Sequence, residues 1–341
     1  MATAGGSTAA TGVPPVVLAV DGGATKTDVV LVGAGGVVLG RARGPATNHQ
    51  LVGLPTALDH LGGTIAEACR AAGVAEDLPV CATGVYCLAG IDLSVDEERV
   101  VPAVVARRWT ETADVRNDTF AVLRAGVSSG WGVGVVCGTG LNCVGLGPDG
   151  SSVRFPALGE LSGDFAPGGL WLGTRGLGLA LRQGDGRGPA TLLATAVPAH
   201  FDLPSPEAVL EAVYRGDLAF GRLAELAEVV LEAAHAGDAG AEQAVTQLVD
   251  EVVLMVTATV FRLDVGTAPV EVVVGGGLFE SRHGFVHRVV EGVHRHVPSA
   301  ALRPLEAPPV LGAALLGLDA LAAGPEAEQA LRADLALAPP D

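Results

Sequence analysis

The chain has 341 residues and a mass of 34.1 kDa, which is too long for one compact core and predicts two domains. Its composition, 49% hydrophobic and 17% charged, excludes a disordered chain, and no apolar run reaches the ~20 residues that a membrane-spanning helix needs. The net charge of −17 argues against nucleic acid and anionic membranes as partners, because a basic stripe is lacking.

The first part of the chain alternates short apolar runs with glycine-rich turns, which is typical of strands joined by tight turns. In chain order, the predicted elements are strands over 16–20, 28–32 and 37–41, a helix over 54–72, a strand over 79–85, a helix from 94 toward 109, and a strand over 114–116. The helix over 54–72 is favoured by Pro55 near its start and Gly73 after its end.

The same pattern of strand, glycine turn, strand, turn and strand begins again near residue 132. In chain order, the predicted elements are strands over 132–137, 142–146 and 152–155, helices over 168–183, 206–214, 218–236 and 240–263, a strand over 270–274, and helices over 284–296 and 310–322. We interpret the restart as an internal duplication, with one copy in each domain.

The turn between the first two strands has the residue types that bind a polyphosphate. It consists of Asp21, Gly22, Gly23, Ala24, Thr25, Lys26 and Thr27. The glycines let backbone N–H groups approach an anion, and the threonine hydroxyls and the one lysine of the chain add donors and charge. Asp21 could hold Mg²⁺ through water. An ordinary hairpin is the less favoured alternative, since hairpins seldom carry Thr-Lys-Thr behind two glycines.

Three further segments are candidates for chemistry. Cys137, Gly138, Thr139 and Gly140 form the equivalent turn of the second copy, and Gly275, Gly276 and Gly277 follow a buried strand. The triple glycine suits close approach to a nucleoside, although a plain left-handed turn is nearly as good an interpretation. Asn117 and Asp118 end a strand between the two copies, where the carboxylate could accept the proton of an attacking hydroxyl. The alternative is that Asp118 caps the helix that starts at Thr119.

These four segments resemble, in order and spacing, the phosphate-1, connect, phosphate-2 and adenosine motifs of the actin, sugar kinase and Hsp70 superfamily. Within it the chain resembles the N-acetylglucosamine kinase and BadF/BadG/BcrA/BcrD ATPase family. The resemblance covers roughly residues 16–322. It implies an α/β fold of duplicated ribonuclease H-like, actin-like ATPase domains around a nucleotide cleft.

The resemblance also implies a division of the chain. We expect a tail over 1–13, a first lobe over 14–118 joined by the final helix 309–323, a second lobe over 119–308, and a tail over 324–341.

The resemblance extends to the segments around Asn48, Asn142 and Asp164, and it implies the following roles. ATP and Mg²⁺ are the expected cofactors, with Asp21 on the metal and Asp118 as the base. The expected nucleotide-binding residues are Gly22, Gly23, Thr25, Lys26, Thr27, Gly138, Thr139, Gly140, Gly275, Gly276 and Gly277. The expected sugar contacts are Asn48, Asn117, Asp118, Asn142 and Asp164. After Asp164 the chain departs from the family's Asp-Glu-Gly-Ser, because Phe165 and Ala166 follow.

The implied activity is ATP-dependent phosphorylation of an amino sugar, first of all N-acetylglucosamine at its 6-hydroxyl. Glucosamine, N-acetylmuramic acid and N-acetylmannosamine stay open as substrates. An ATPase that activates an electron-transfer partner is an alternative, and a sugar-sensing DNA-binding regulator is a third. Such a regulator would need a helix-turn-helix domain, and only about fifteen residues precede the first strand.

The remaining expectations concern the cellular compartment, the partners and the oligomeric state. The five cysteines include no CxxC pair, which favours reduced, buried thiols in a cytoplasmic protein. The expected partner is a small sugar, without nucleic acid or membrane, and the resemblance implies a homodimer.

Overall fold

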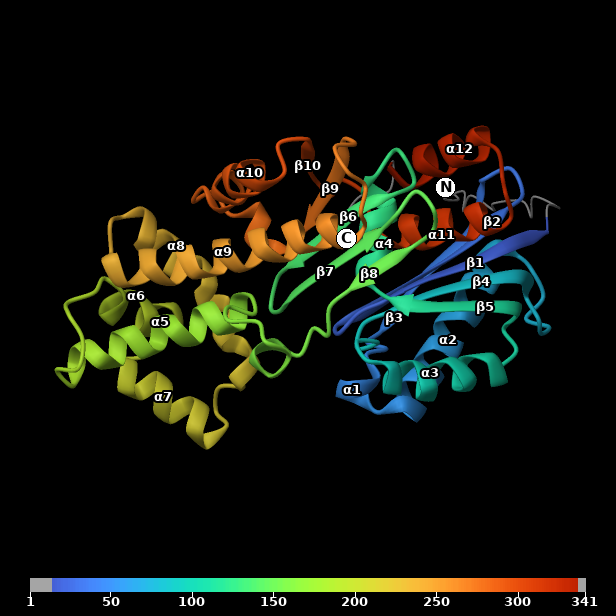
Figure 1. Cartoon of the computed structure of the whole chain (residues 1–341). Helices are drawn as coiled ribbons and strands as arrows, with labels where there is room; N and C mark the ends of the chain where they lie inside the picture. Colours follow the sequence, from blue (N-terminus) through green and yellow to red (C-terminus); the bar gives the residue numbers. More distant parts are fainter. Residues whose placement is uncertain (1–13, 337–341) are drawn as a thin grey trace, which may run out of the picture. The chain divides into compact units, whose positions relative to one another are not determined.

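The computed structural model describes residues 14–336 of the chain. It contains two compact units, of which the first runs through Gly126 and resumes at Glu306, and the second is Val127–Leu305. Figure 1 shows their helices and strands, coloured along the chain. The predicted tail over residues 1–13, and residues 337–341 of the predicted C-terminal tail, lie outside the described residues.

The first unit is built on a five-stranded sheet with the order β3-β2-β1-β4-β5. Its strands are β1 (Pro15–Gly22), β2 (Lys26–Gly33), β3 (Val38–Pro45), β4 (Cys81–Leu88) and β5 (Thr110–Asn117). The strands β1, β2 and β3 are antiparallel neighbours, whereas β4 and β5 continue the sheet parallel to β1. The carboxyl ends of β1, β4 and β5 therefore lie at one edge.

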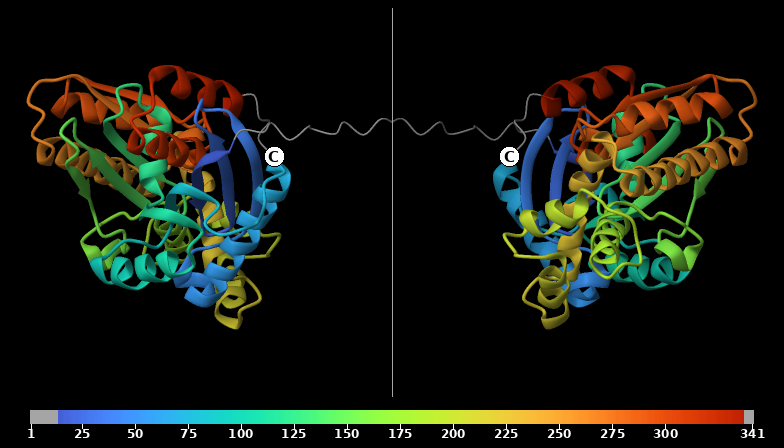
Figure 2. Two further views of the ribbon diagram at one scale, coloured as in Figure 1. Left: turned by 90° about the vertical axis from the view of Figure 1, so that its right-hand side faces the viewer. Right: turned by 90° about the vertical axis from the view of Figure 1, so that its left-hand side faces the viewer.

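Helices cover both faces of this sheet (Figure 2). They are α1 (His49–Val52), α2 (Leu54–Ala72), α3 (Ser94–Ala106), α4 (Thr119–Gly126), α11 (Pro309–Ala320) and α12 (Pro325–Ala336). Leu18 packs in one core with Leu61 of α2, while its neighbour Val17 meets Gly317 of α11, as the alternation of side chains along a strand requires.

The second unit has a five-stranded sheet with the order β10-β9-β6-β7-β8. Its strands are β6 (Gly132–Cys137), β7 (Leu141–Leu146), β8 (Ser152–Arg154), β9 (Val270–Gly275) and β10 (Ala300–Pro304). Its helices are α5 (Gly169–Gly184), α6 (Leu193–His200), α7 (Pro206–Arg215), α8 (Leu226–His235), α9 (Ala239–Arg262) and α10 (Phe285–His296). As in the first unit, three antiparallel strands are extended by two parallel ones.

The two sheets share one topology, with β1 to β5 matching β6 to β10 in order and direction. The predicted α/β class and internal duplication are therefore confirmed. β10 and α6 were not predicted from the sequence. β10 is a short edge strand that ends in Pro304, and α6 contains Pro198, so both lack a clear periodic signal.

Two segments differ from the predictions. Residues 325–336, expected within a tail, form α12, whose buried Ala327, Leu331 and Leu335 pack one side of the helix on the first unit. The helix predicted from 94 toward 109 is α3, which has Leu93 at its N-cap, where the Asp96 carboxylate accepts the N–H of Leu93 at 2.9 Å. That helix ends at Ala106, before the position expected.

Helix α9 is long and apolar enough to cross a membrane by length and composition, because an 18-residue window within it has a mean hydropathy of 1.6. However, 61% of that window is buried inside the second unit, where residues such as Leu248, Val252 and Val256 belong to its core. This burial is typical of the central helix of a globular domain.

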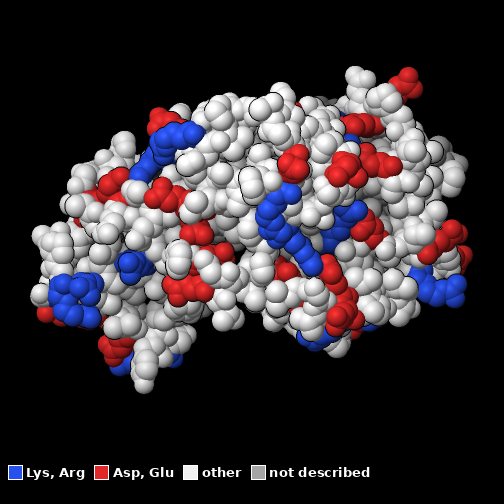
Figure 3. All heavy atoms as spheres, in the orientation of Figure 1, with Lys and Arg blue, Asp and Glu red and all other residues white. Residues whose placement is uncertain are grey.

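On the face drawn in Figure 3, basic side chains lie among acidic ones.

Candidate functional site

Acidic side chains gather at the carboxyl edge of the first sheet. Asp21 lies at the end of β1, level with Cys87 of β4, and Cys87 is level with Arg116 of β5. Asp118 follows β5 directly. This register therefore brings the carboxyl groups of Asp21 and Asp118 to the same edge of the sheet, with β4 between their strands.

The two carboxyl groups have strongly shifted pKa values. Burial, and secondly the charge of Asp118, raises the pKa of Asp21 to about 7. Burial, and secondly the charge of Asp92, raises the pKa of Asp118 to about 6, although hydrogen bonds from Thr119 hold it down in part. Carboxyl groups with pKa values this close to neutrality are typical of proton-transfer and cation-binding sites.

Asp92 was not singled out from the sequence, and the structure brings it to this edge. Its Oδ1 accepts a hydrogen bond from Asn117 Nδ2 at 3.0 Å, and its Oδ2 lies 3.4 Å from the donor Gln50 Nε2. Its position four residues after β4, just beyond the turn at Gly90, was the available signal. A carboxylate just beyond a buried parallel strand is a common site position.

The side chain of Asn117 is buried and makes hydrogen bonds within the protein. Its amide nitrogen donates to Asp92 and to the carbonyl of Ile91, and its Oδ1 accepts the N–H of Thr119 at 3.0 Å. The carbonyl of Asp118 accepts the N–H of Ala121 at 3.0 Å, so Asp118 occupies the capping position of α4 as well as the site edge. The two alternatives for Asp118, a base and a helix cap, are therefore compatible with each other.

The hairpin between β1 and β2 has an exposed tip. Gly23 N donates to Lys26 O at 2.8 Å, and Ala24, Thr25 and Lys26 are exposed. The ammonium group of Lys26 lies 3.9 Å from Asp28, whose carboxylate also binds Arg43 through two nitrogens at 2.7 and 3.2 Å. The tip thus presents a hydroxyl and a cation to an incoming anion.

Two residues of this hairpin contribute to the packing of the fold. Thr27 is fully buried, and its hydroxyl donates to Pro45 O at 2.8 Å and lies 2.9 Å from the hydroxyl of Thr47. A Cβ at Gly22 would lie 2.3 Å from Thr47 Oγ1 and 2.6 Å from Leu88, so glycine is required there by packing. Asn48 also has a structural bond, since its Oδ1 accepts the N–H of Gln50 and begins α1.

In the second unit, the two predicted glycine segments come together. A Cβ at Gly276, whose φ is +95°, would lie 2.5 Å from Cys137 O and 3.0 Å from Gly138 N. The triple-glycine turn therefore packs directly on the hairpin 138–140. Gly138 and Gly140 have open space beside them, and Thr139 is exposed.

The start of α5 supports the same hairpin from another side. Gly169 N donates to Gly138 O at 2.8 Å and Leu170 N donates to Thr139 O at 2.9 Å. These bonds occupy carbonyl oxygens of the hairpin, and Gly138 N donates across it to Gly140 O at 2.9 Å, so the Thr139 hydroxyl and the N–H groups of Thr139 and Gly140 are the groups that could face an anion.

Asp164 is buried, and its Oδ2 accepts a hydrogen bond from Ser162 Oγ at 2.8 Å. Burial raises its pKa. Glu251 of α9, which was not predicted as a site residue, accepts the N–H of Phe165 at 3.1 Å, and its pKa is raised by burial and then by the charge of Asp164. Asn142 lies on β7, where its Oδ1 accepts the N–H of Cys143 at 2.8 Å.

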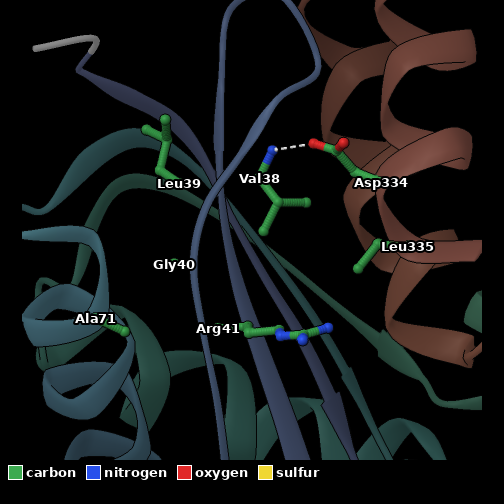
Figure 4. Close-up of a pocket in the computed structure, with 7 residues that line it drawn as sticks. All are labelled: Val38, Leu39, Gly40, Arg41, Ala71, Asp334 and Leu335. Atoms are coloured by element: carbon green, nitrogen blue, oxygen red, sulfur yellow. Dashed lines mark hydrogen bonds between the residues drawn. The ribbon is translucent and has the colours of Figure 1, made fainter. Parts of the chain in front are cut away.

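Two cavities in the first unit lie apart from these residues. One of about 350 Å³ separates β3 from α12 and is lined by Val38, Leu39, Gly40, Arg41, Ala71, Asp334 and Leu335 (Figure 4). The other, of about 380 Å³, lies beside β5 and is lined by residues that include Trp109 and Glu111. Neither is lined by a predicted site residue.

The chemistry of the donors fits a hydrated cation. Within residues 14–336, no three His, Cys, Asp or Glu side chains gather as a ligand set. Mg²⁺ commonly keeps several waters and uses one or two carboxylates plus substrate phosphates, which Asp21 could provide. The five cysteines are buried and free of disulfides, and burial raises the pKa of Cys137 and of Cys143 to about 12.

Comparison with known proteins gives consistent matches. The family model described as the BadF/BadG/BcrA/BcrD ATPase family matches residues 18–317. N-acetyl-D-glucosamine kinase of Dictyostelium discoideum is 25% identical over 314 residues, which cover 89% of this chain and 98% of the relative. N-acetylmuramic acid/N-acetylglucosamine kinase of Clostridium acetobutylicum is 26% identical over 206 residues, 60% of this chain and 67% of the relative.

Solved structures show the fold. A Chromobacterium violaceum protein assigned as an N-acetylglucosamine kinase has a TM-score of 0.68 at 24% identity, covering 89% of this chain and 99% of the other. The Schistosoma mansoni hexokinase complexed with glucose has a TM-score of 0.54 at 16% identity, covering 90% and 86%. The duplicated sheets thus have the actin-like ATPase fold.

Proposed function

Since this chain belongs to the BadF/BadG/BcrA/BcrD ATPase family, we propose that it is an ATP-dependent kinase of an amino sugar, with N-acetylglucosamine 6-phosphate as its product. Support comes from a relative named as an N-acetyl-D-glucosamine kinase that matches 89% of the chain, and from one named as an N-acetylmuramic acid/N-acetylglucosamine kinase that matches 60% of it. The observation that carries the proposal is the pair of carboxyl groups, Asp21 and Asp118, with raised pKa values at one sheet edge beside the exposed hairpin that contains Lys26.

Asp118 is the proposed base. With a pKa of about 6, it is mostly ionised at pH 7 and can accept the hydroxyl proton as the sugar oxygen bonds to the γ-phosphorus and the bond to ADP breaks. A pKa near neutrality leaves the carboxylate ionised at pH 7 and makes it a stronger base than an ordinary aspartate. Asn117 and Thr119 hold Asp118 in place through the bonds described above.

The phosphate-binding groups are assigned within each unit. In the first, the exposed residues Thr25 and Lys26 offer donors, and Asp21 would hold Mg²⁺ through water. In the second, the N–H groups of Thr139 and Gly140 and the hydroxyl of Thr139 offer further donors. Bound Mg²⁺ supplies neutralisation of the phosphate charge. We assign Thr27 and Gly22 to the packing of the hairpin, from their burial and close contacts.

The nucleoside and sugar contacts are proposed from the resemblance. Gly275, Gly276 and Gly277 would approach the nucleoside, and Asn48, Asn142 and Asp164 the sugar. Asp164 would bind a sugar hydroxyl through the oxygen that Ser162 leaves available. The hydrogen bonds of Asn117 favour a positioning role for it.

The test is sugar-dependent release of ADP over a panel of N-acetylglucosamine, glucosamine, N-acetylmuramic acid and N-acetylmannosamine, with the product site identified by NMR. We expect phosphorylation of N-acetylglucosamine at the 6-position. Asp118→Ala should lower turnover on the order of 10²–10⁴-fold while ATP binding persists. Asp77→Ala, a change at an exposed aspartate of the same unit, is the control. Equal turnover of both variants would remove Asp118 from the mechanism.

The family also supports a second candidate, an ATPase that activates an electron-transfer partner. Buried, protonated thiols such as Cys137 are poor ligands for an iron–sulfur cluster within one chain. Iron bound to anaerobically purified protein, together with ATP hydrolysis that no sugar stimulates, would favour this candidate over the kinase. We further propose a cytoplasmic homodimer, which sedimentation equilibrium would test.

A further inference from the structure

Helix α4 connects the proposed base, Asp118, to the point where the chain leaves the first unit. It begins directly after Asp118 and ends at Gly126, where the chain leaves this unit. It has eight residues, of which the seven from Thr119 to Ala125 are buried. Because a helix this short is only about 12 Å long, a shift at its C-terminal end is transmitted to the residue at its start.

A buried arginine holds the C-terminal part of α4. The side chain of Arg124 is 3% exposed, and its guanidinium donates to both oxygens of Asp319 at 2.7 and 3.0 Å. It also donates to both oxygens of Glu328 on α12, at 3.2 and 2.9 Å. Such paired contacts fix the orientation of a guanidinium as well as its position.

Helix α12 makes a second contact with the same end of α4. Arg332 Nη1 donates to the carbonyl of Ala125 at 2.7 Å, one of the last carbonyls of the helix, which have no partner within it. Arg332 also donates from Nε to Glu328 at 2.8 Å, so the two side chains of α12 support each other.

Helix α11 fixes the remaining side. A Cβ at Gly312 would lie 1.8 Å from Ala121 O, so α11 and α4 pack backbone against backbone. Helix α4 is therefore held by α11 along one side and by Glu328 and Arg332 of α12 at its C-terminal part.

We propose that α12 positions Asp118 through α4, with Glu328 and Arg332 as positioning residues for proton transfer. This inference rests on the proposed function, because it takes Asp118 as the base. A positioning role and a purely structural role differ in their consequences. The first predicts a loss of turnover in protein that is fully folded, whereas the second predicts a loss of stability alone.

The experiment compares Glu328→Gln and Arg332→Met with Glu326→Gln, which changes an exposed glutamate on the same helix. All are assayed in the full chain, at a temperature where circular dichroism shows them folded. We expect kcat to fall roughly 10- to 100-fold for the first two, with KM values for sugar and ATP unchanged within about twofold. Arg332→Lys, which keeps a donor, should recover part of the loss.

A measurement without substrates separates this inference from the proposed function. Amide hydrogen exchange of the peptide covering 118–126 should become roughly tenfold faster in Glu328→Gln and Arg332→Met, and stay unchanged in Glu326→Gln. Unaltered exchange, or wild-type kcat in folded variants, would overturn the inference. If the wild type phosphorylates no sugar, the proposed function fails, while exchange still decides whether α12 restrains α4.

Discussion

Replacing Asp92 with asparagine should move the acidic limb of the pH profile to lower pH. The charge of Asp92 is the second cause, after burial, of the raised pKa of Asp118, which is about 6 against an ordinary value near 3.8. Removing a neighbouring negative charge favours ionisation of the remaining carboxyl group. We expect the pKa of Asp118 to fall by about one unit. The asparagine oxygen can still accept the bond from Asn117 Nδ2.

The effect is large enough to measure. With a pKa of about 6, roughly a quarter of Asp118 is ionised at pH 5.5, and with a pKa of about 5, roughly three quarters would be. At pH 5.5, kcat/KM relative to its own plateau should therefore be about three times higher in the variant. The assay is kcat/KM from pH 5 to 8.

The control for this prediction is Asp77→Asn, which removes one negative charge from an exposed position of the same unit. Its pH profile should coincide with that of the wild type. An acidic limb that stays in place in Asp92→Asn, or moves to higher pH, would refute the electrostatic coupling between Asp92 and Asp118.

Three further changes test separate parts of the site. Lys26→Met should raise KM for ATP about tenfold, whereas Arg41→Met, at an exposed arginine of β3, should not; equal KM values would exclude Lys26 from phosphate binding. The folded state raises the pKa of Asp21 to about 7, so its protonated form stabilises the fold at low pH and this contribution is lost as pH rises from about 4 to 7. Asp21→Asn should then raise the free energy of unfolding at pH 8 by about 1–2 kcal/mol while weakening activation by Mg²⁺; a lower value in urea denaturation would contradict this. Gly276→Ala, where the added Cβ meets Cys137 O at a φ of +95°, should lower Tm by several degrees and weaken nucleotide binding measured by calorimetry, and an unchanged Tm would show that the turn adapts.

Local sequence patterns determined much of the fold. The spacing over Leu54–Ala72 with Gly73 beyond it, and the apolar run Gly132–Cys137, correspond to α2 and β6 without change. The repeated strand and glycine-turn pattern predicted that both sheets have the same topology. These features depend on neighbours a few positions apart, whose steric and hydrogen-bonding preferences act before any tertiary contact forms.

The tertiary structure alone decided which side chains are available for chemistry. Thr25 and Thr27 look equivalent in the sequence, but one is exposed and the other is buried against Thr47. Asp92 becomes relevant only because the register of β4 and β5 brings it near Asp118.

The contact between Arg124 and Glu328 joins residues 204 positions apart. Burial and long-range charge pairing depend on how distant segments pack, and a one-dimensional pattern of residue types carries no record of that packing.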